Sequence, residues 1–285
     1  DWERLGYVLS RTTMANWIIR CSEDYFSKFV ARLKTEMLKE KILHCDETYV
    51  KVLKERNVSS ESKQYMWVYR TGKHSRKHSD RQIVIYDYNK SRSGDVPKKY
   101  LGDYDGFVHT DGYAGYNKLT KVTHCNCWAH VRRKFHEAMV VNSEDSIARV
   151  ARDYCDKLFE IEAKLDSLTT EDRFNKRLMQ EKPVFEAFWS WAEKAAQTVL
   201  AKSKLGKAFE YAFKRREYLG SYFKNGDCVI SNNAGENAIR PFTVGRKTGC
   251  SVTLQGVPKQ AQRSIALWRQ QRQTDLMFSN TLNYC

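Results

Sequence analysis

Three acidic residues occupy positions where a carboxylate is hard to explain as ordinary surface. Asp46 lies inside a strand-like run, Asp111 ends another run and is followed at once by Gly112, and Glu236 opens a short helix rich in polar residues. Carboxylate oxygens are the ligands that hard cations such as Mg²⁺ prefer, and close carboxylates repel one another unless a cation lies between them. The pattern therefore predicts a site for Mg²⁺ or Mn²⁺ at these three side chains.

The charge of the chain suggests what such a site would act on. Lys and Arg number 49 against 34 Asp and Glu, which gives a formal net charge of +15. This excess favours polyanions, nucleic acid first, because neutralising phosphates releases counterions. Two cations about 3.5–4 Å apart activate a water or a 3′-hydroxyl and stabilise the leaving oxygen of an in-line displacement. The combination indicates cutting and joining of a phosphate backbone.

Spacing alone leaves a simpler interpretation open. Asp111 could cap a turn, and Asp46 with Glu47 could be a solvated pair. A basic protein need not have a special partner either, because net charge speaks of association and not of fold.

The composition excludes several classes of protein. A chain of 285 residues that is 41% hydrophobic can bury a large core, so it is not disordered as a whole. No run approaches the ~20 apolar residues of a membrane span, and the N-terminus has no signal-peptide pattern. The eight cysteines are scattered, as in reduced cytosolic proteins. We expect a cytoplasmic protein without a membrane partner.

The hydrophobic period changes along the chain from helix to strand and back. Residues 8–40 have a helical period, and strand-type runs rich in Val, Ile, Tyr and Trp follow at 42–53, 65–70, 82–88, 107–111 and 122–128. Helices are predicted at 95–101, at 129–140 and throughout 144–215. The first three strands should form an antiparallel meander, to which later strands are added through helices. This predicts an α/β (mixed α+β) fold, and Asp46 meets Asp111 if the first and fourth strands are neighbours.

Four segments resemble the transposases of bacterial insertion-sequence family sixty-six. They are His44-Cys45-Asp46-Glu47-Thr48, His109-Thr110-Asp111-Gly112-Tyr113-Ala114-Gly115-Tyr116, Cys127-Trp128-Ala129-His130-Val131-Arg132-Arg133-Lys134-Phe135 and Ile230-Ser231-Asn232-Asn233-Ala234-Gly235-Glu236, followed by Arg240-Pro241 and Gly245-Arg246-Lys247. The resemblance covers about residues 8–247. It implies an RNase H-like fold of the DDE type, with Asp46, Asp111 and Glu236 as the catalytic and metal-binding triad, and with a helical insertion before the last catalytic helix.

The resemblance also implies the reaction and its partners. The expected activity is cleavage and strand transfer at insertion-sequence ends, with two Mg²⁺ or Mn²⁺ ions. The expected partners are double-stranded DNA of the transposon ends and target, further copies of the chain on that DNA, and element-encoded helper proteins near the bacterial nucleoid. One departure is Asn237, which stands where the family has Arg after the glutamate. A catalytically inactive DNA-binding remnant is the alternative, because the family's upstream DNA-binding region is mostly missing and the end of the chain departs from the family's sequence.

Basic residues supply candidate DNA contacts. We expect phosphate contacts, which position DNA without reading its sequence, from Arg132, Arg133, Lys134, Arg240, Arg246 and Lys247. The alternative for each residue is a solvated helix face. By the resemblance, His130 lines the active site.

The segment 9–18 is similar to the second helix of a helix-turn-helix. It begins at a capping serine and would present Arg11 and Asn16 to DNA. A plain packing helix is an equal alternative, because such short patterns recur by chance.

A zinc site at His124, Cys125, Cys127 and His130 is less well supported. The Cys125-x-Cys127 spacing lacks the usual gap of two to four residues, and no second cysteine pair follows. A structural zinc protein is the least favoured interpretation.

The composition changes again after Lys247. Residues 248–285 are rich in Gln and Arg and have no clear period, whereas the family continues with Asn-Trp-Leu-Phe and a long helix. A permitted back-translation shifted by one nucleotide restores both, which predicts a frameshifted and poorly ordered tail. The predicted parts are a helical segment with a helix-turn-helix-like remnant at 1–40, the first part of the RNase H-like core at 41–143, a helical insertion at 144–225, the core helix with Glu236 at 226–247, and the tail at 248–285.

Overall fold

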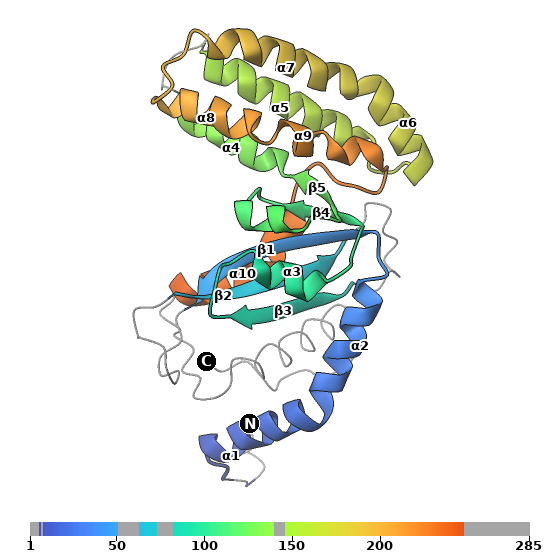
Figure 1. Ribbon diagram of the computed structural model, residues 1–285, viewed down its shortest axis with the longest axis vertical. Helices are drawn as coiled ribbons and strands as arrows, with labels where there is room; N and C mark the ends of the chain where they lie inside the picture. Colours follow the sequence, from blue (N-terminus) through green and yellow to red (C-terminus); the bar gives the residue numbers. More distant parts are fainter. Residues whose placement is uncertain (1–5, 7, 51–62, 73–81, 140–145, 248–285) are drawn as a thin grey trace.

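The computed structural model describes residues 6, 8–50, 63–72, 82–139 and 146–247, and every structural statement below refers to these. Figure 1 shows three parts along the longest axis: a layer of helices, a central sheet, and a helical arm formed by the N-terminal segment. The predicted frameshifted tail, residues 248–285, lies outside the described residues.

The centre of the molecule is a five-stranded mixed sheet with the strand order β3-β2-β1-β4-β5. Its strands are β1 (Ile42–Val50), β2 (Gln64–Thr71), β3 (Val84–Asn89), β4 (Phe107–Thr110) and β5 (Thr123–Asn126). The pairs β1–β2 and β2–β3 are antiparallel, whereas β1–β4 and β4–β5 are parallel. Parallel neighbours need a crossover, and the crossover into β4 contains α3 (Asp95–Leu101). The predicted meander and the predicted β1–β4 contact are confirmed, and the sheet is compatible with an RNase H-like fold.

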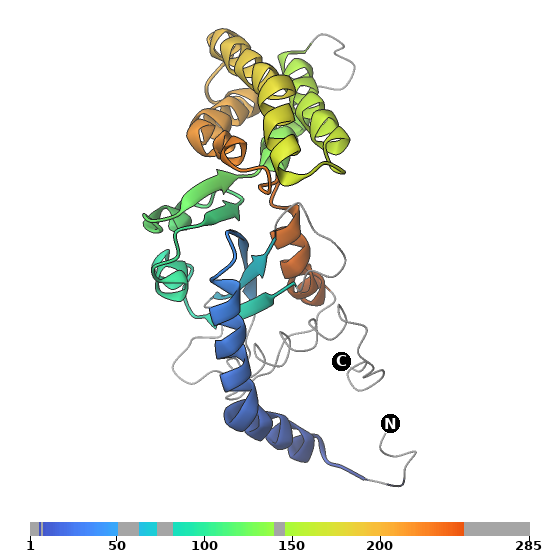
Figure 2. The ribbon, with the colours of Figure 1, turned by 90° about the vertical axis from the view of Figure 1, so that its right-hand side faces the viewer.

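One face of β1–β3 is covered by α10 (Asn233–Lys247), as Figure 2 shows. Val68 and Tyr86 of the sheet form a buried cluster with Ala238 and Ile239 of the helix. The hydroxyl of Tyr86 also donates a 2.8 Å hydrogen bond to the carbonyl of Ala238. The helix that carries Glu236 is thus fixed to the sheet by apolar packing along its length.

The opposite face of the sheet packs on α2 (Ser27–Met37), on α3 and on the 3₁₀ helix η3 (Ala114–Lys118). Leu43 and Cys45 of β1 lie in this cluster with Met37, Leu101 and Tyr116. Side chains alternate between the two faces of a strand, so these odd-numbered residues leave His44 and Asp46 to the α10 side.

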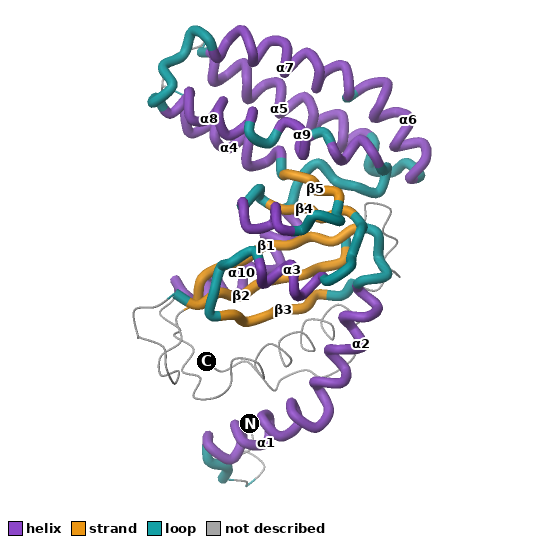
Figure 3. Tube along the Cα trace, in the orientation of Figure 1, coloured by secondary structure: helices purple, strands orange, loops and turns teal. Residues whose placement is uncertain are grey.

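The chain between Asn126 and Asn233 forms the helical layer drawn as coiled tubes in Figure 3. Its elements are α4 (Trp128–Ala138), α5 (Ile147–Lys164), α6 (Thr170–Gln180), α7 (Lys182–Ala196), α8 (Lys204–Phe213), α9 (Arg216–Leu219) and the 3₁₀ helix η4 (Ser221–Lys224). Buried aromatic rings dominate its core, among them Trp128, Phe135, Phe188, Trp189 and Phe209. The predicted helical character of residues 144–215 is confirmed wherever that range is described.

A buried ion network ties the helical layer to the segment before α10. The guanidinium of Arg177 donates to both carboxylate oxygens of Glu162, at 2.6 and 3.1 Å. It also donates to the carbonyls of Tyr222, Asn225 and Cys228, at 2.8, 3.1 and 3.0 Å. One side chain of α6 therefore holds three backbone carbonyls of the segment that leads to Glu236.

The N-terminal arm consists of α1 (Arg11–Cys21), the π-helical turn η2 (Ser22–Phe26) and α2. As predicted, Ser10 caps the first helix, because its hydroxyl accepts a 3.0 Å hydrogen bond from the Thr13 amide. Trp17 and Tyr25 are mostly exposed on this arm.

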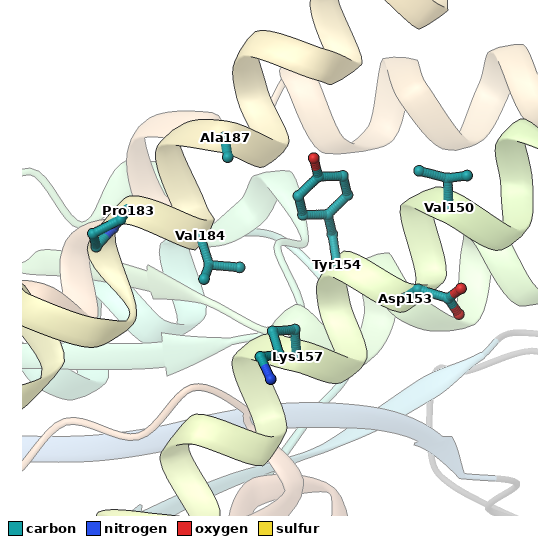
Figure 4. A pocket seen from close by; sticks show the side chains of 7 residues that line it. All are labelled: Val150, Asp153, Tyr154, Lys157, Pro183, Val184 and Ala187. Atoms are coloured by element: carbon teal, nitrogen blue, oxygen red, sulfur yellow. The ribbon is translucent and has the colours of Figure 1, made fainter.

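A shallow pocket between α5 and α7 is shown in Figure 4. It is lined by Val150, Asp153, Tyr154, Lys157, Pro183, Val184 and Ala187. In the described part of the chain, no helix has the length and apolar character needed to cross a membrane.

Candidate active site

The parallel register of β1 and β4 brings Asp46 next to Asp111. His44 pairs with His109 across the two strands, and each aspartate lies two residues further along its own strand direction. The two-residue period of a strand puts Asp46 on the same face as His44, and Asp111, one residue past the end of β4, lies near enough for its charge to raise the pKa of Asp46. The two histidine rings stack with their centroids 4.7 Å apart. The equal two-residue offset from His44 and His109 thus brings Asp46 and Asp111, two members of the predicted triad, towards each other.

The backbone around Asp111 is held by one side chain of α8 and one from the segment that follows this helix. The hydroxyl of Tyr211 donates a 2.8 Å hydrogen bond to the Asp111 carbonyl, and Arg215 donates one of 2.8 Å to the Gly112 carbonyl. Gly112 has a φ of +88°, and a Cβ there would lie 2.2 Å from Nε of Arg215. Only glycine meets both conditions. Oδ1 of Asp111 accepts a 2.8 Å bond from the Tyr113 amide.

Asn232 positions the helix that carries Glu236. Its side-chain amide donates to the Cys45 carbonyl at 2.9 Å, and its Oδ1 lies 2.9 Å from Nδ1 of His44. Its carbonyl accepts the amide of Glu236, one helical turn later, at 3.1 Å. The side chain of Asn232 is buried and bridges β1 to the start of α10, so Glu236 is set relative to β1 by a short chain of hydrogen bonds.

The charges of the other two predicted carboxylates, Asp111 and Glu236, act on Asp46. Burial, together with the negative charges of Glu47, Asp111 and Glu236, raises the pKa of Asp46 to about 8, against a hydrogen bond from the Glu47 amide that lowers it. Crowded carboxylates that lack a counter-charge are what a hard cation relieves. The donor set therefore fits Mg²⁺ or Mn²⁺, and without a cation Asp46 holds a proton at neutral pH.

Glu236 has incomplete polar contacts of its own. Its Oε1 is buried and has no hydrogen-bond partner among the described residues, and the same is true of Nδ1 of His130. These two atoms are 3.5 Å apart, and Arg133 approaches Oε2 of Glu236 at 3.7 Å. Burial lowers the pKa of His130, an effect that Glu236 and Asp111 oppose. His130 thus lies at the site, and Glu236 keeps an oxygen free for a ligand.

Glu47 is buried on the other face of β1 and is already paired. Its carboxylate accepts bonds from Nε and from a terminal nitrogen of Arg92, at 3.0 and 2.7 Å, and from the Tyr116 hydroxyl at 2.7 Å. Burial, followed by the charge of Asp111, raises its pKa. Glu47 is therefore not part of a solvated pair, and Asp46 is half-buried.

The predicted DNA-contact residues fall in different places. Arg132 pairs with Asp156 and so joins α4 to α5, and Lys134 lies 3.8 Å from Glu137 on its own helix. Arg133 and Arg240 are exposed near Glu236, whereas Asn16 is exposed on the distant N-terminal arm. The remaining three, Arg11, Arg246 and Lys247, have their backbone in α1 or α10, and their side chains lie outside the described atoms.

Sequence reasoning missed the residues that support the site. Tyr211, Arg215 and Arg92 contact the loops of the carboxylates from distant parts of the chain, and no local pattern marks them. Asn232 belonged to a quoted motif, but its role as a bridge became visible only with the contact to Cys45.

Comparison with known proteins places the chain in a family. A sequence model described as "Transposase IS66 family" matches residues 1–256. The chain belongs to the IS66 transposase family. This confirms the resemblance drawn from the sequence, and the family implies DNA as substrate and divalent metal ions for its chemistry.

Curated relatives come from Sinorhizobium fredii (strain NBRC 101917 / NGR234). The uncharacterized protein y4hP is 30% identical over 202 residues, which cover 65% of this chain and 36% of that protein. The uncharacterized protein y4qI is 29% identical over 259 residues, covering 86% of this chain and 47% of the relative. The chain thus spans less than half the length of these relatives. No solved structure matches the chain significantly.

Proposed function

We propose that this chain catalyses divalent-metal-dependent cleavage and strand transfer of DNA at the ends of an insertion sequence. The observation that carries the proposal is the parallel register of β1 and β4, which brings the strand of Asp46 beside the strand that leads into Asp111, with Asn232 linking β1 to the helix of Glu236; the raised pKa of Asp46 agrees with it. Three carboxylates that come from β1, β4 and α10 and lack a cationic partner of matching strength form a site for hard cations. Membership of the IS66 transposase family supplies the DNA substrate.

Each carboxylate has a role that follows from its position. Asp46 and Asp111, adjacent on parallel strands, would hold the metal between them, and Glu236 would complete the site from the helix above. When bound, two Mg²⁺ or Mn²⁺ ions would lower the pKa of the attacking water or 3′-hydroxyl and stabilise the leaving 3′-oxygen. The nucleophiles are water and then a DNA 3′-hydroxyl, so the protein needs no nucleophilic side chain.

The surroundings of the triad would position the DNA backbone. Arg133 and Arg240 are exposed close to Glu236 and are suited to phosphate contacts. His130 lies against Glu236 with a buried nitrogen free of hydrogen bonds, and would orient the carboxylate or a phosphate oxygen. Copies of the chain assembled on paired ends, and helper proteins of the element, belong to the same proposal.

A DNA-binding protein without cleavage activity is the second candidate. It is favoured by Asn237, which stands exposed one residue after Glu236, where the family resemblance leads one to expect arginine. The loss of that charge weakens a phosphate contact next to the metal site and leaves the basic surface otherwise intact.

A nicking assay separates the two. The full chain is incubated with labelled DNA that carries the element's terminal sequence, with Mg²⁺, with Mn²⁺ or with chelator. The proposal expects cleavage only with metal, and its loss in Asp111→Asn. Glu210→Gln is the matched control, because Glu210 is an exposed carboxylate paired with Lys214 on α8. DNA binding without metal-dependent cleavage would reject the enzymatic function in favour of the second candidate.

A further inference from the structure

A second group of ligand-type side chains lies in the core, away from the three carboxylates. His109 of β4, Cys125 of β5 and Cys228 of the segment before α10 each place a donor atom within 4.8 Å of the other two. All three side chains are at most 1% exposed. They come from three segments that are distant in sequence. The zinc site considered from the sequence, at His124, Cys125, Cys127 and His130, shares only Cys125 with this group.

The donor atoms are those of a soft-metal site. The imidazole of His109 can offer the lone pair of a ring nitrogen to a metal ion. Its Nε2 is buried without a hydrogen-bond partner among the described residues, whereas buried polar atoms are nearly always paired. Thiolate and imidazole donors select Zn²⁺ and Cu(I) over Mg²⁺.

Charge and size fit the same class of ion. Two thiolates and one neutral imidazole balance the charge of Zn²⁺, and a site of zero net charge tolerates burial; with Cu(I) the same donors would leave one net negative charge, so charge favours Zn²⁺. Metal–sulfur bonds of about 2.3 Å and metal–nitrogen bonds of about 2.0 Å place the donors at separations compatible with the 4.8 Å limit that the three atoms meet. The nearby guanidinium of Arg177, which contacts the Cys228 carbonyl, has its charge countered by Glu162.

We propose that His109, Cys125 and Cys228 bind one thiophilic cation, Zn²⁺ or Cu(I), at a structural site separate from the carboxylate triad. Binding would release the two thiol protons to solvent, since only the thiolates coordinate. The cation would join β4, β5 and the segment leading to α10. Cys228 lies four residues before Asn232, which bridges to β1, so the site would fix the chain just upstream of the catalytic helix.

Elemental analysis and Co²⁺ spectroscopy of the full chain test the proposal. The chain is purified without chelator, dialysed against Mg²⁺, and analysed for zinc and copper. The expected result is one Zn²⁺ or Cu(I) per chain, and, after replacement by Co²⁺, a sulfur-to-metal charge-transfer band. Both should be lost in Cys228→Ser and in Cys125→Ser, which are close in size to the native residue. Chelator should lower the Tm of the wild-type chain by about 5 °C and leave that of Cys228→Ser unchanged.

Two controls separate this site from others. Cys155→Ser alters a buried cysteine outside both groups and should keep metal and band. Cys127→Ser alters the group that Cys127 forms with His130 and Glu236, and it should also keep them. A band that disappears in Cys127→Ser but persists in Cys228→Ser would place the thiolate ligand at the triad and overturn the proposal.

The wild-type chain decides the matter even if both serine variants fail to fold. A purified chain that holds no thiophilic metal and gives no charge-transfer band with Co²⁺ contradicts the site. So does an intact mass two hydrogens lower, with Cys125 and Cys228 joined in one peptide, because a disulfide would then explain their proximity. Neither result affects the nicking assay, whose outcome depends on the carboxylates.

Discussion

The imidazole rings of His44 and His109 stack across β1 and β4, with centroids 4.7 Å apart and planes inclined by 22°. Each ring precedes an aspartate of the proposed triad by two residues, so the stack lies one pleat below the pair of carboxylates. His44 also contacts Asn232, whose side chain reaches the Cys45 carbonyl. The same two rings therefore lie under the strand-borne carboxylates and beside the start of the helix that carries Glu236.

Asp46→Asn should stabilise the metal-free protein while abolishing cleavage. The pKa of Asp46 is raised to about 8 in the fold, so the folded state binds a proton more tightly than the unfolded state. Stability from this group is complete below the unfolded pKa near 4 and falls as pH rises towards 8. Asparagine cannot ionise, so the free energy of unfolding at pH 8–9 should rise by about 2–4 kcal/mol, measured by urea denaturation with chelator.

Measurements at low pH provide an internal control for Asp46→Asn. At pH 3, below the unfolded pKa near 4, the wild-type carboxyl is protonated in both the folded and the unfolded state, and the difference between wild type and variant should nearly vanish. Asp103→Asn, an exposed residue paired with Lys121, should show no such rise at high pH. Equal stabilities of wild type and Asp46→Asn from pH 5 to 9 would contradict the buried, crowded carboxyl.

Asn232→Ala should loosen the helix that carries Glu236. It removes two side-chain hydrogen bonds of 2.9 Å, to the Cys45 carbonyl and to His44, and leaves both partners buried. Each unsatisfied buried group costs about 1–3 kcal/mol, so we expect about 2–4 kcal/mol of lost stability in chemical denaturation. Asn233→Ala, at the exposed neighbouring position, is the control and should change stability by less than about 0.5 kcal/mol.

Gly112→Ala should lower the free energy of unfolding by more than the positive φ of Gly112 alone explains. An alanine there meets both the strain of φ +88° and an overlap at 2.2 Å with Nε of Arg215. Gly102 has a φ of +60° with no atom within 4 Å of a built Cβ, so Gly102→Ala reports the strain without the overlap. We expect about 1 kcal/mol for Gly102→Ala and about 2–4 kcal/mol for Gly112→Ala, measured by denaturation.

The function of the loop gives a second measurement for Gly112→Ala. Because Arg215 and Tyr211 hold the backbone of residues 111 and 112, metal-dependent nicking should fall at least tenfold in Gly112→Ala and stay within twofold in Gly102→Ala. Similar activities of the two variants would show that the Arg215 contact does not fix the Asp111 carboxylate.

Arg177→Met should be severely destabilising. It leaves the Glu162 carboxylate buried without its main counter-charge and frees three backbone carbonyls. Removing one partner of a buried pair costs about 3–5 kcal/mol. Lys118→Met breaks the exposed pair with Asp95 and should cost about 0–1 kcal/mol. Thermal unfolding of the two variants distinguishes them, and equal Tm values would contradict a structural role for the network.

The sheet was predictable because its signals are local. Turns between 42 and 88 predicted an antiparallel meander, and the observed strands match within a few residues. Asp46 and Asp111 could be paired because β1 and β4 are parallel neighbours and the two aspartates lie at an equal offset from the paired residues His44 and His109. The bridge from Asn232 to Cys45 and the buried partners of Glu47 depend on contacts between distant segments, which no periodicity records.

The helical layer contacts two segments that lead to carboxylates of the proposed triad: the loop at Asp111 and the segment before α10, which carries Glu236. Tyr211 and Arg215 of its α8 region hold residues 111 and 112, and Arg177 of α6 holds the segment before α10. A ribosome-bound chain that has emerged as far as Asp111 carries two acidic ligands and no scaffold for the third. The proposed site can therefore assemble only after the helical layer and Glu236 have been synthesised.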